Sequence, residues 1–454
     1  MLKTKKTHVT DMTEGNALKV IIQFALPLMA ANVLQQIFSL TDAMILGIFT
    51  GDEGLAVVGT SSWPIWFQVS ALTNFGQAAC LLAAVRFGAK DGEALKRVVG
   101  NIYLASVVIG VVMMLGLQLA AEPLMRIQGT PEEIFDDAMV YLRIMLAGTV
   151  FLLIYNMLSS LLRAVGDSVT SFTAITAAAV INVGLDIVLV AGLHMGPAGA
   201  AIATIASQAV SALICLVKIR DYREFDMKKE YLKPDRAILV EYTGTCLPML
   251  AQSLVISLGG GFVQSQINQF GTAFAAGVSA AGKIFGVVET AAIALAQASA
   301  SFVSQNVGAG RFDRIRKETV QVCLFALVMA FGVGAVMILF GRQMLAIYVT
   351  EDAIEYAMGD LVVTSVALLL MYPMYVLRQN VQALGNMRIP LIAAVLQLVM
   401  RVLTSSLLPM VMGREGIYYA TPAAWLVTLI LIGIVYPRQF AICRRKREAQ
   451  LRAA

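Results

Sequence analysis

The chain has 454 residues, of which 58% are hydrophobic and 14% charged, with a net charge of +5. A soluble domain is about 45–50% apolar and about 25% charged, so length and composition exclude a string of ordinary soluble domains. They also exclude a disordered chain, which needs low hydrophobicity and high charge. The composition is that of an all-α, polytopic membrane protein.

Apolar segments long enough to cross a bilayer recur along the whole chain. A spanning helix needs about 20 mainly apolar residues, and these segments lack the period-two alternation of membrane strands. The sequence therefore predicts twelve transmembrane helices. They cover residues 18–50, 54–85, 98–121, 137–162, 168–193, 197–219, 238–270, 274–305, 318–341, 357–384, 390–412 and 417–437.

Lysine and arginine are distributed unevenly between the two sides of this arrangement. With the N-terminus inside, the outer loops contain only Arg126, Arg342 and Arg414, and the inner segments hold the other loop cations. Cytoplasmic loops of membrane proteins carry such an excess. We expect both termini in the cytoplasm, and the basic balance needs no nucleic-acid partner.

The chain also repeats itself at an offset of about 220 residues. The matching stretches are ALPLM from Ala25 with CLPML from Cys246, FGAK from Phe87 with VGAG from Val307, TPEEI from Thr130 with TEDAI from Thr350, and RAVGD from Arg163 with QALGN from Gln382. Each copy holds six helices, so both copies enter the membrane in the same sense, and an axis along the membrane normal should relate them. The expected organisation is a cytoplasmic segment 1–17, an N-lobe 18–219, a linker 220–237, a C-lobe 238–440 and a basic tail 441–454.

Ionisable residues inside apolar helices are costly and usually mark a pathway or a site. The first lobe contains Asp42 and Asp186, and Asn182 lies one helical turn before Asp186, on the same face. Asn156 and Thr204 are further oxygen donors at a plausible depth. These five residues could converge on Na⁺ or share a proton; alternatively, the two aspartates lie near helix ends and reach water. Pro27 is expected to kink the first helix.

The second lobe lacks an equivalent acidic pair, and no acid lies at mid-membrane depth in its first and fourth helices. Its ionisable residues are Lys283, Glu289, Arg378 and Arg401, and the first lobe adds Arg143. Interhelix pairing or snorkelling explains such residues as well as a substrate site does. The stretch from Gly277 to Lys283 matches GxxxxGK, but Ile284 replaces the required Ser or Thr and no strand precedes it, so ATP binding is not expected.

Aromatic side chains of the first two helices could stack on a planar organic cation or anchor the chain at the membrane interface. The expected substrate cavity comprises Gln36, Phe38, Trp63, Trp66, Lys283, Glu289 and Arg378. Five scattered cysteines and two histidines predict neither a disulfide framework nor a zinc site.

The sequence resembles the multidrug and toxic compound extrusion (MATE) transporters of bacteria over nearly its whole length. The resemblance rests on Leu26-Pro27, the following Leu34-Gln35-Gln36 and Thr41-Asp42, the stretch GDEGLAVVG from Gly51, and FVSQNVGAG from Phe302. It implies a monomeric antiporter of the bacterial inner membrane, neither an enzyme nor cofactor-dependent, that exports cationic amphipathic compounds in exchange for H⁺ or Na⁺. Members with a first-lobe cation site use residues that match Asp42, Asn182, Asp186 and Thr204, with Asn156 as a partner.

Two other transporter classes and one enzyme class are alternatives to this interpretation. A flippase of lipid-linked oligosaccharides, or an exporter of anionic metabolites, from the same wider superfamily would favour the basic residues of the second lobe. A major-facilitator transporter would carry GxxxDRxGR between helices two and three, where this chain reads RFGAKDGE from Arg86. A membrane enzyme would need a catalytic constellation of His, Cys or Ser residues, and this sequence contains none.

Overall fold

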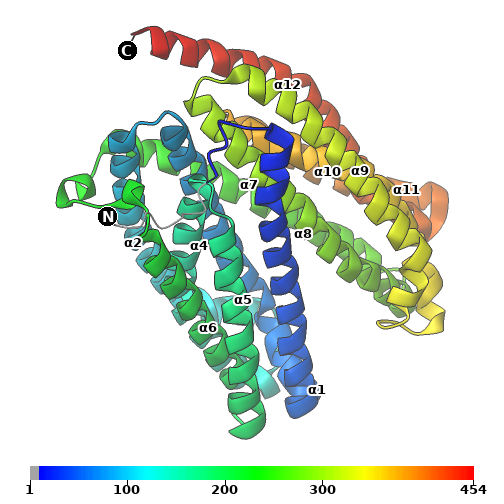
Figure 1. Ribbon diagram of the computed structural model, residues 1–454. Coiled ribbons are helices and arrows are strands. Elements are labelled where there is room, and N and C mark those ends of the chain that lie inside the picture. The colour runs from blue at the N-terminus through cyan, green and yellow to red at the C-terminus, as the bar shows by residue number, and fades with distance from the viewer. Residues whose placement is uncertain (1–9, 454) are drawn as a thin grey trace. The chain divides into compact units, whose positions relative to one another are not determined.

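The computed structural model describes residues 10–453, and the described chain is almost entirely helical, without strands. Helices of 13 to 72 residues succeed one another with short turns between them (Figure 1). The helices are α1 (Ala17–Gly88), α2 (Gly92–Ile127), α3 (Phe135–Ala147), α4 (Thr149–Ala164), α5 (Val169–Asp186), α6 (Gly196–Ile219), α7 (Arg236–Asn268), α8 (Thr272–Gly308), α9 (Phe312–Leu345), α10 (Glu351–Ala383), α11 (Arg388–Met412) and α12 (Ala420–Ala453). Short helical turns are η1 (Glu132–Ile134), η2 (Ile187–Gly192), η3 (Arg223–Phe225), η4 (Lys229–Leu232) and η5 (Gly413–Tyr419).

The twelve predicted crossings correspond to these elements. Ten stretches of the described chain are long and apolar enough to cross a membrane. One is α1, in which Gly51, at φ +66° and ψ −156°, separates two helices; another, Arg388–Gln450, contains both α11 and α12. The predicted segment 137–162 is built by α3 and α4 together.

The kink predicted at Pro27 does not take the form of a break in the helix and otherwise stays a prediction. Backbone dihedrals remain helical through Pro27, and Gly51 is the break within α1. A proline removes one hydrogen-bond donor and crowds the preceding turn, but the helix around Pro27 accommodates both without a break.

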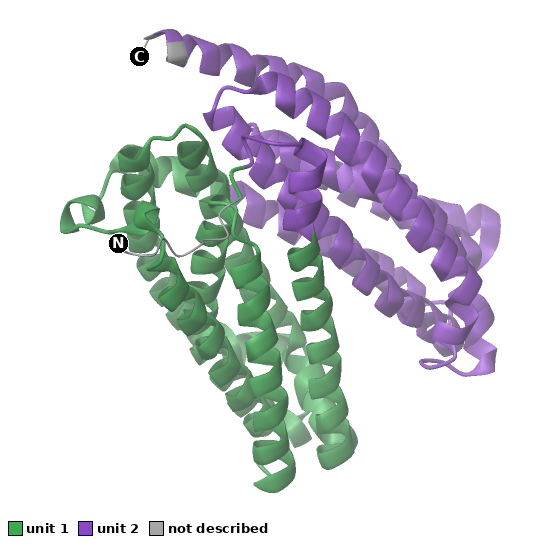
Figure 2. Ribbon diagram, in the orientation of Figure 1, with its two compact units in different colours: residues 1–11, 26–246 green, residues 12–25, 247–454 purple. Residues whose placement is uncertain are grey.

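The chain divides into two compact units (Figure 2). Unit 1 contains residues 1–11 and 26–246, and unit 2 contains residues 12–25 and 247–454. The units follow the expected lobes except at two helix starts, because residues 12–25 group with the second unit and residues 238–246 with the first. The two divisions within helices fall after Ala25 and after Cys246, which are equivalent positions of the sequence repeat.

Small residues let the helices of each unit pack closely, as is common within membranes. In unit 1, a Cβ added to Gly76 of α1 would come within 2.8 Å of the Asn156 carbonyl oxygen of α4. In unit 2, α10 packs against α8 and α9, and a Cβ at Gly334 would come within 2.8 Å of the Ser365 carbonyl oxygen. Close backbone packing fixes the depth at which polar side chains of neighbouring helices meet.

Candidate functional site

Two aspartates of unit 1 meet inside the helical bundle. Asp42 lies in the first half of α1, and Asp186 is the last residue of α5, where the α-helix gives way to the wider turns of η2. Their carboxyl groups lie within hydrogen-bonding reach of each other. Asp186 is 1% exposed and Asp42 is half-buried, so Asp186 lies in the protein interior and Asp42 is partly accessible.

Asn182 and Thr204 complete the polar set around the pair. Asn182 is fully buried one turn before Asp186, and its Nδ2 donates a long hydrogen bond of 3.5 Å to the Thr204 hydroxyl on α6. Three helices thus contribute oxygen-bearing side chains to one region. Asp42 lies beside Asp186, and Asn182 bonds Thr204 one turn away; the role of these four residues as a cation site stays a prediction.

Asn156 takes a different arrangement from the one expected. Its Nδ2 donates to the Leu152 carbonyl of its own helix at 2.9 Å, a bond that satisfies the amide locally. None of the described hydrogen bonds joins Asn156 to the aspartate pair.

Tyr141 of α3 is a neighbour that sequence reasoning missed. It is 8% exposed, and its phenol lies close enough to interact electrostatically with both Asp42 and Asp186. A tyrosine on an apolar helix carries no formal charge, so it gave no signal in the search for ionisable residues. The structure places it as a polar neighbour of the site.

The oxygens of this site lack donors. Asp42 Oδ1, Asn182 Oδ1 and both carboxylate oxygens of Asp186 are buried, and none accepts a hydrogen bond from the described chain. Buried polar atoms are nearly always paired, and two adjacent carboxylates cannot both stay charged without compensation. These ligand oxygens therefore suit a shared proton, or a hard monovalent cation held by carboxylate, amide and hydroxyl oxygens. The described residues contain no cluster of three His, Cys, Asp or Glu side chains.

The aromatic residues expected to line a substrate cavity are more open. Trp63 and Trp66, in the second half of α1, are 50% and 41% exposed, and Trp63 stacks on Phe67 with ring centroids 6.4 Å apart. Gln36 and Phe38 are half-buried. No described hydrogen bond or ring contact joins these four residues to the aspartate pair.

The ionisable residues of unit 2 form a cluster of their own. The Tyr375 hydroxyl donates to Glu289 Oε1 at 2.5 Å, and the Arg378 guanidinium stacks over the Tyr375 ring at 4.4 Å. Arg378 and Arg401 are both buried. Lys283 is exposed and lies 5.3 Å from the ring centroid of Tyr348. Arg143 of unit 1 is exposed, as expected of a cation that reaches the surface.

Two acidic residues of unit 2 were not identified as candidates from the sequence. Asp360 lies on α10, the fourth helix of the second lobe, and lines a partly open cavity of unit 2. Glu318 of α9 is fully buried. The prediction that no acid lies at mid-membrane depth in the fourth helix of the second lobe stays a prediction, because Asp360 lies in the first third of α10.

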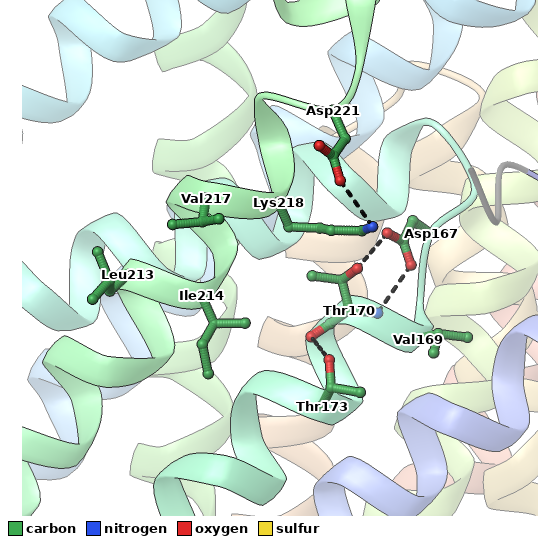
Figure 3. Close-up of a pocket in the computed structure, with 9 residues that line it drawn as sticks. All are labelled: Asp167, Val169, Thr170, Thr173, Leu213, Ile214, Val217, Lys218 and Asp221. Carbon is green, nitrogen blue, oxygen red and sulfur yellow. Dashed lines mark hydrogen bonds and ion pairs between the residues drawn. The ribbon is translucent and has the colours of Figure 1, made fainter. Parts of the chain in front are cut away.

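A second pocket lies between α5 and α6 of unit 1 (Figure 3). Its volume is about 560 Å³ and its walls are mainly apolar. At one end, Asp167 accepts hydrogen bonds from the Thr170 amide at 2.9 Å and from the Tyr222 hydroxyl at 2.5 Å. Burial, reinforced by this carboxylate, raises the pKa of Tyr222 far above its usual value. Both Asp167 oxygens thus accept hydrogen bonds within the protein. The bond from the Thr170 amide holds the first turn of α5 in place.

Two six-helix lobes with a repeated sequence, and a buried acidic pair in one of them, define a multi-pass membrane protein of transporter type. The family model MatE matches the chain twice, at residues 27–188 and 248–407. The chain belongs to the MatE family, whose members are transporters rather than enzymes. Both matches begin at the equivalent prolines Pro27 and Pro248, which confirms the duplication.

Several known proteins are similar to this chain over most of its length. It is 29% identical over 423 residues to "Probable multidrug resistance protein YoeA" of Bacillus subtilis, covering 90% of this chain and 91% of that protein. It is 24% identical to "Multidrug export protein MepA" of Staphylococcus saprophyticus, covering 91% and 90%. A solved outward-facing multidrug resistance MATE family transporter of the MOP superfamily superimposes with a TM-score of 0.90 at 22% identity, covering 97% of this chain and all of that one. This last similarity establishes the fold.

Proposed function

We propose that this protein exports cationic, amphipathic drugs and toxic compounds in exchange for H⁺ or Na⁺. The observation that carries the proposal is the buried Asp42–Asp186 pair, whose oxygens receive no hydrogen bond from the described chain. Its relatives are named for multidrug resistance and multidrug export. An acidic site that must be neutralised supplies what an antiporter requires, namely a group that alternates between an ion and its exchange partner.

The coupling step follows from charge balance at the pair. When one proton or one Na⁺ enters, the repulsion between the two carboxylates is relieved and the packing of α1 against α5 can tighten. When the ion leaves, the net negative charge returns and favours an organic cation. Because the two occupants compete for the same charge, uptake of one promotes release of the other by alternating access.

The ions differ in which atoms they need. A proton requires only the two carboxyl groups, whereas Na⁺ would draw on Asp42, Asp186, the Asn182 amide oxygen and the Thr204 hydroxyl. Hard cations prefer such oxygen ligands. The drive is about 1.4 kcal/mol per tenfold ion gradient and about 2.3 kcal/mol per charge for each 100 mV. One ion thus sustains a useful substrate gradient without ATP.

The same proposal places the protein in the bacterial inner membrane as a monomer, with both termini in the cytoplasm. Its support is the positive-inside distribution of lysine and arginine, in which the proposed outer loops hold only Arg126, Arg342 and Arg414. An exporter of lipid-linked or anionic compounds remains a second candidate, since Arg378 and Arg401 are both buried in unit 2.

Ethidium efflux tests the proposal in energised cells that lack their own pumps, under imposed pH or sodium jumps. Wild-type protein should extrude ethidium in response to one of the two ions. Asp186→Asn should abolish efflux at equal expression, and Asp42→Asn should do the same. Glu122→Gln is the matched control, because Glu122 is an exposed carboxylate that pairs with Arg126 on the surface of α2. Full efflux by Asp186→Asn would exclude the acidic pair from coupling; no efflux by well-expressed wild type would exclude ethidium export.

A further inference from the structure

Unit 2 contains a partly open cavity of about 410 Å³. Residues of α7, α8, α10, α11, α12 and η5 line it, so it lies among the helices of the C-lobe and is separate from the Asp42–Asp186 site. Its volume falls in the range of sites for small organic molecules. The residues that give it chemical character are Lys283, Phe285, Asp360, Arg401, Tyr418 and Trp425.

Arg401 is the main charged group of the cavity. It is 9% exposed, its Nη1 donates to the Ile256 carbonyl at 3.0 Å, and its buried Nε has no hydrogen-bond partner. Gly259 of α7 makes room for it, since a Cβ there would lie 3.2 Å from Arg401 Cδ. A buried guanidinium with an unused donor is costly unless an acceptor reaches it.

The cavity carries an excess of positive charge. In the described part of the chain, neither Arg401 nor Lys283 has a carboxylate oxygen within 4.0 Å. Close to Arg401, the carboxylate of Glu289, which accepts from the Tyr375 hydroxyl, and the guanidinium of Arg378 carry opposite charges. Asp360 is the one acid among the described residues that line the cavity, so the lining cations Lys283 and Arg401 exceed the lining acids by one.

Aromatic side chains supply the apolar part of the wall. Phe285 of α8 and Trp425 of α12 stack with ring centroids 5.6 Å apart and an interplanar angle of 29°. Tyr418 stacks on Phe274 with centroids 5.7 Å apart. Flat apolar surfaces beside two cationic donors suit a molecule with an apolar, preferably planar, body and one anionic group.

We propose that this C-lobe cavity binds an amphipathic anion, with its carboxylate or phosphate held by Arg401 and Lys283 and its apolar body against Phe285 and Trp425. Arg401 supplies the fixed, buried donor, and the longer, exposed Lys283 supplies the mobile one. Asp360 limits the affinity for anions by repulsion. The anionic group belongs either to a soluble organic acid or to a lipid headgroup, and the same two side chains serve both.

The test uses full-length purified protein in nanodiscs of phosphatidylcholine, with dansylglycine as the fluorescent probe. Dansylamide, which lacks the carboxylate, is the paired neutral probe. Dansylglycine should bind at least about tenfold more tightly than dansylamide, which is the scale of one charge-assisted hydrogen bond. Equal binding of the two probes would overturn the proposal.

Variants then locate the binding. Arg401→Gln and Lys283→Gln should each weaken dansylglycine binding about tenfold and leave dansylamide binding unchanged. Asp360→Asn should strengthen dansylglycine binding, since it removes a repelling charge. Arg143→Gln is the control, because Arg143 is an exposed arginine of unit 1. Lys283 is exposed, so its variant should fold even if Arg401→Gln does not. Wild-type affinity in a folded Lys283→Gln variant would overturn the proposal.

The source of the anion is settled by a second nanodisc composition that contains phosphatidylglycerol. If a lipid phosphate occupies the cavity, phosphatidylglycerol should reduce dansylglycine binding to wild type but have less effect on Arg401→Gln. If the natural ligand is a soluble acid, dansylglycine should bind equally in both membranes. Phosphatidylglycerol that lowers probe binding equally in wild type and both variants would contradict the assigned residues.

Discussion

Lys90 and Gly310 occupy the same turn in the two lobes, and both adopt a left-handed backbone, with φ of +57° and +70°. They end the equivalent stretches FGAK and VGAG, after α1 and after α8. The turns at Gly166 and Gly385 form a second pair, with φ of +88° and +84°. The duplicated lobes therefore share backbone conformation as well as helix order.

Lys90→Gly should stabilise the protein. A non-glycine residue in the left-handed region costs about 1–2 kcal/mol, which Gly310 avoids in the second lobe. Part of the gain is offset because glycine loses more backbone entropy on folding, so a net gain of about 0.5–1 kcal/mol is expected. Thermal unfolding in detergent, followed by a thiol-reactive dye at the buried Cys80, Cys215 and Cys246, would measure it. Lys96→Gly, within α2, should instead destabilise, and a lower midpoint for Lys90→Gly would show that the lysine side chain stabilises the turn.

Ion binding at the acidic pair should be visible as a gain in stability. A ligand that binds only the folded state at 100 times its dissociation constant stabilises by about 2.7 kcal/mol. Whichever of Na⁺ and H⁺ drives efflux should therefore raise the unfolding midpoint of wild type, over the same concentration range in which it drives transport. The dependence should vanish in Asp42→Asn and persist in Glu122→Gln. An unchanged dependence in Asp42→Asn would place the ion elsewhere.

Tyr141→Phe should weaken ion coupling without abolishing export. The phenol lies near both carboxyl groups, but none of the described hydrogen bonds joins it to them, so the substitution removes a neighbouring polar group rather than a hydrogen bond. The concentration of coupling ion that gives half-maximal efflux should rise, whereas the maximal rate at saturating ion should change little. Tyr103→Phe on α2 is the matched tyrosine control. A fall in the maximal rate with an unchanged ion requirement would instead indicate a role in substrate passage.

The two aspartates could be predicted as candidate site residues from the sequence, because the features that mark them are local in the chain. Asp42 and Asp186 interrupt apolar helices, and the four-residue spacing from Asn182 to Asp186 places both on one helical face. The meeting of α1 and α5 was an inference from the resemblance and from charge, and the structure supplies it. The sequence did not identify Tyr141 as a site residue, because an uncharged tyrosine is ordinary in a membrane helix. Only the packing of the helices brings it near the carboxyl groups.

The two missed acids have one common cause, namely helix starts placed too late. The predicted helices began at residues 318 and 357, whereas α9 begins at Phe312 and α10 at Glu351. Hydropathy marks the apolar interior of a helix and not its polar first turns. Glu318 is the first residue of its predicted segment and Asp360 the fourth, although each lies well within its helix.

The buried carboxylate of Glu318 should contribute substantially to the stability of unit 2. Ser299 donates to its Oε1 at 2.7 Å and Thr319 to its Oε2 at 3.2 Å, and Ser299 and Thr319 also bond Asn380 and Tyr436. Glu318→Ala removes the acceptor shared by two buried hydroxyls and leaves a cavity, at a cost of about 2–4 kcal/mol. Glu318→Gln keeps the side-chain shape and one acceptor oxygen, so it should cost less than half as much.

Unfolding midpoints of these two variants would check this prediction, with Glu351→Ala as the control because Glu351 is exposed and pairs with Arg342 at the surface. The loss in Glu318→Ala should appear as earlier unfolding with efflux retained below the midpoint. If Glu318→Gln instead unfolds normally but loses efflux, the carboxyl group takes part in proton movement, and the hydrogen-bond network around Ser299 would have to be assigned to transport rather than to stability. Equal midpoints for all three variants would show that Glu318 contributes nothing measurable to stability, and that Asn380 and Tyr436 satisfy the Ser299 and Thr319 hydroxyls without it.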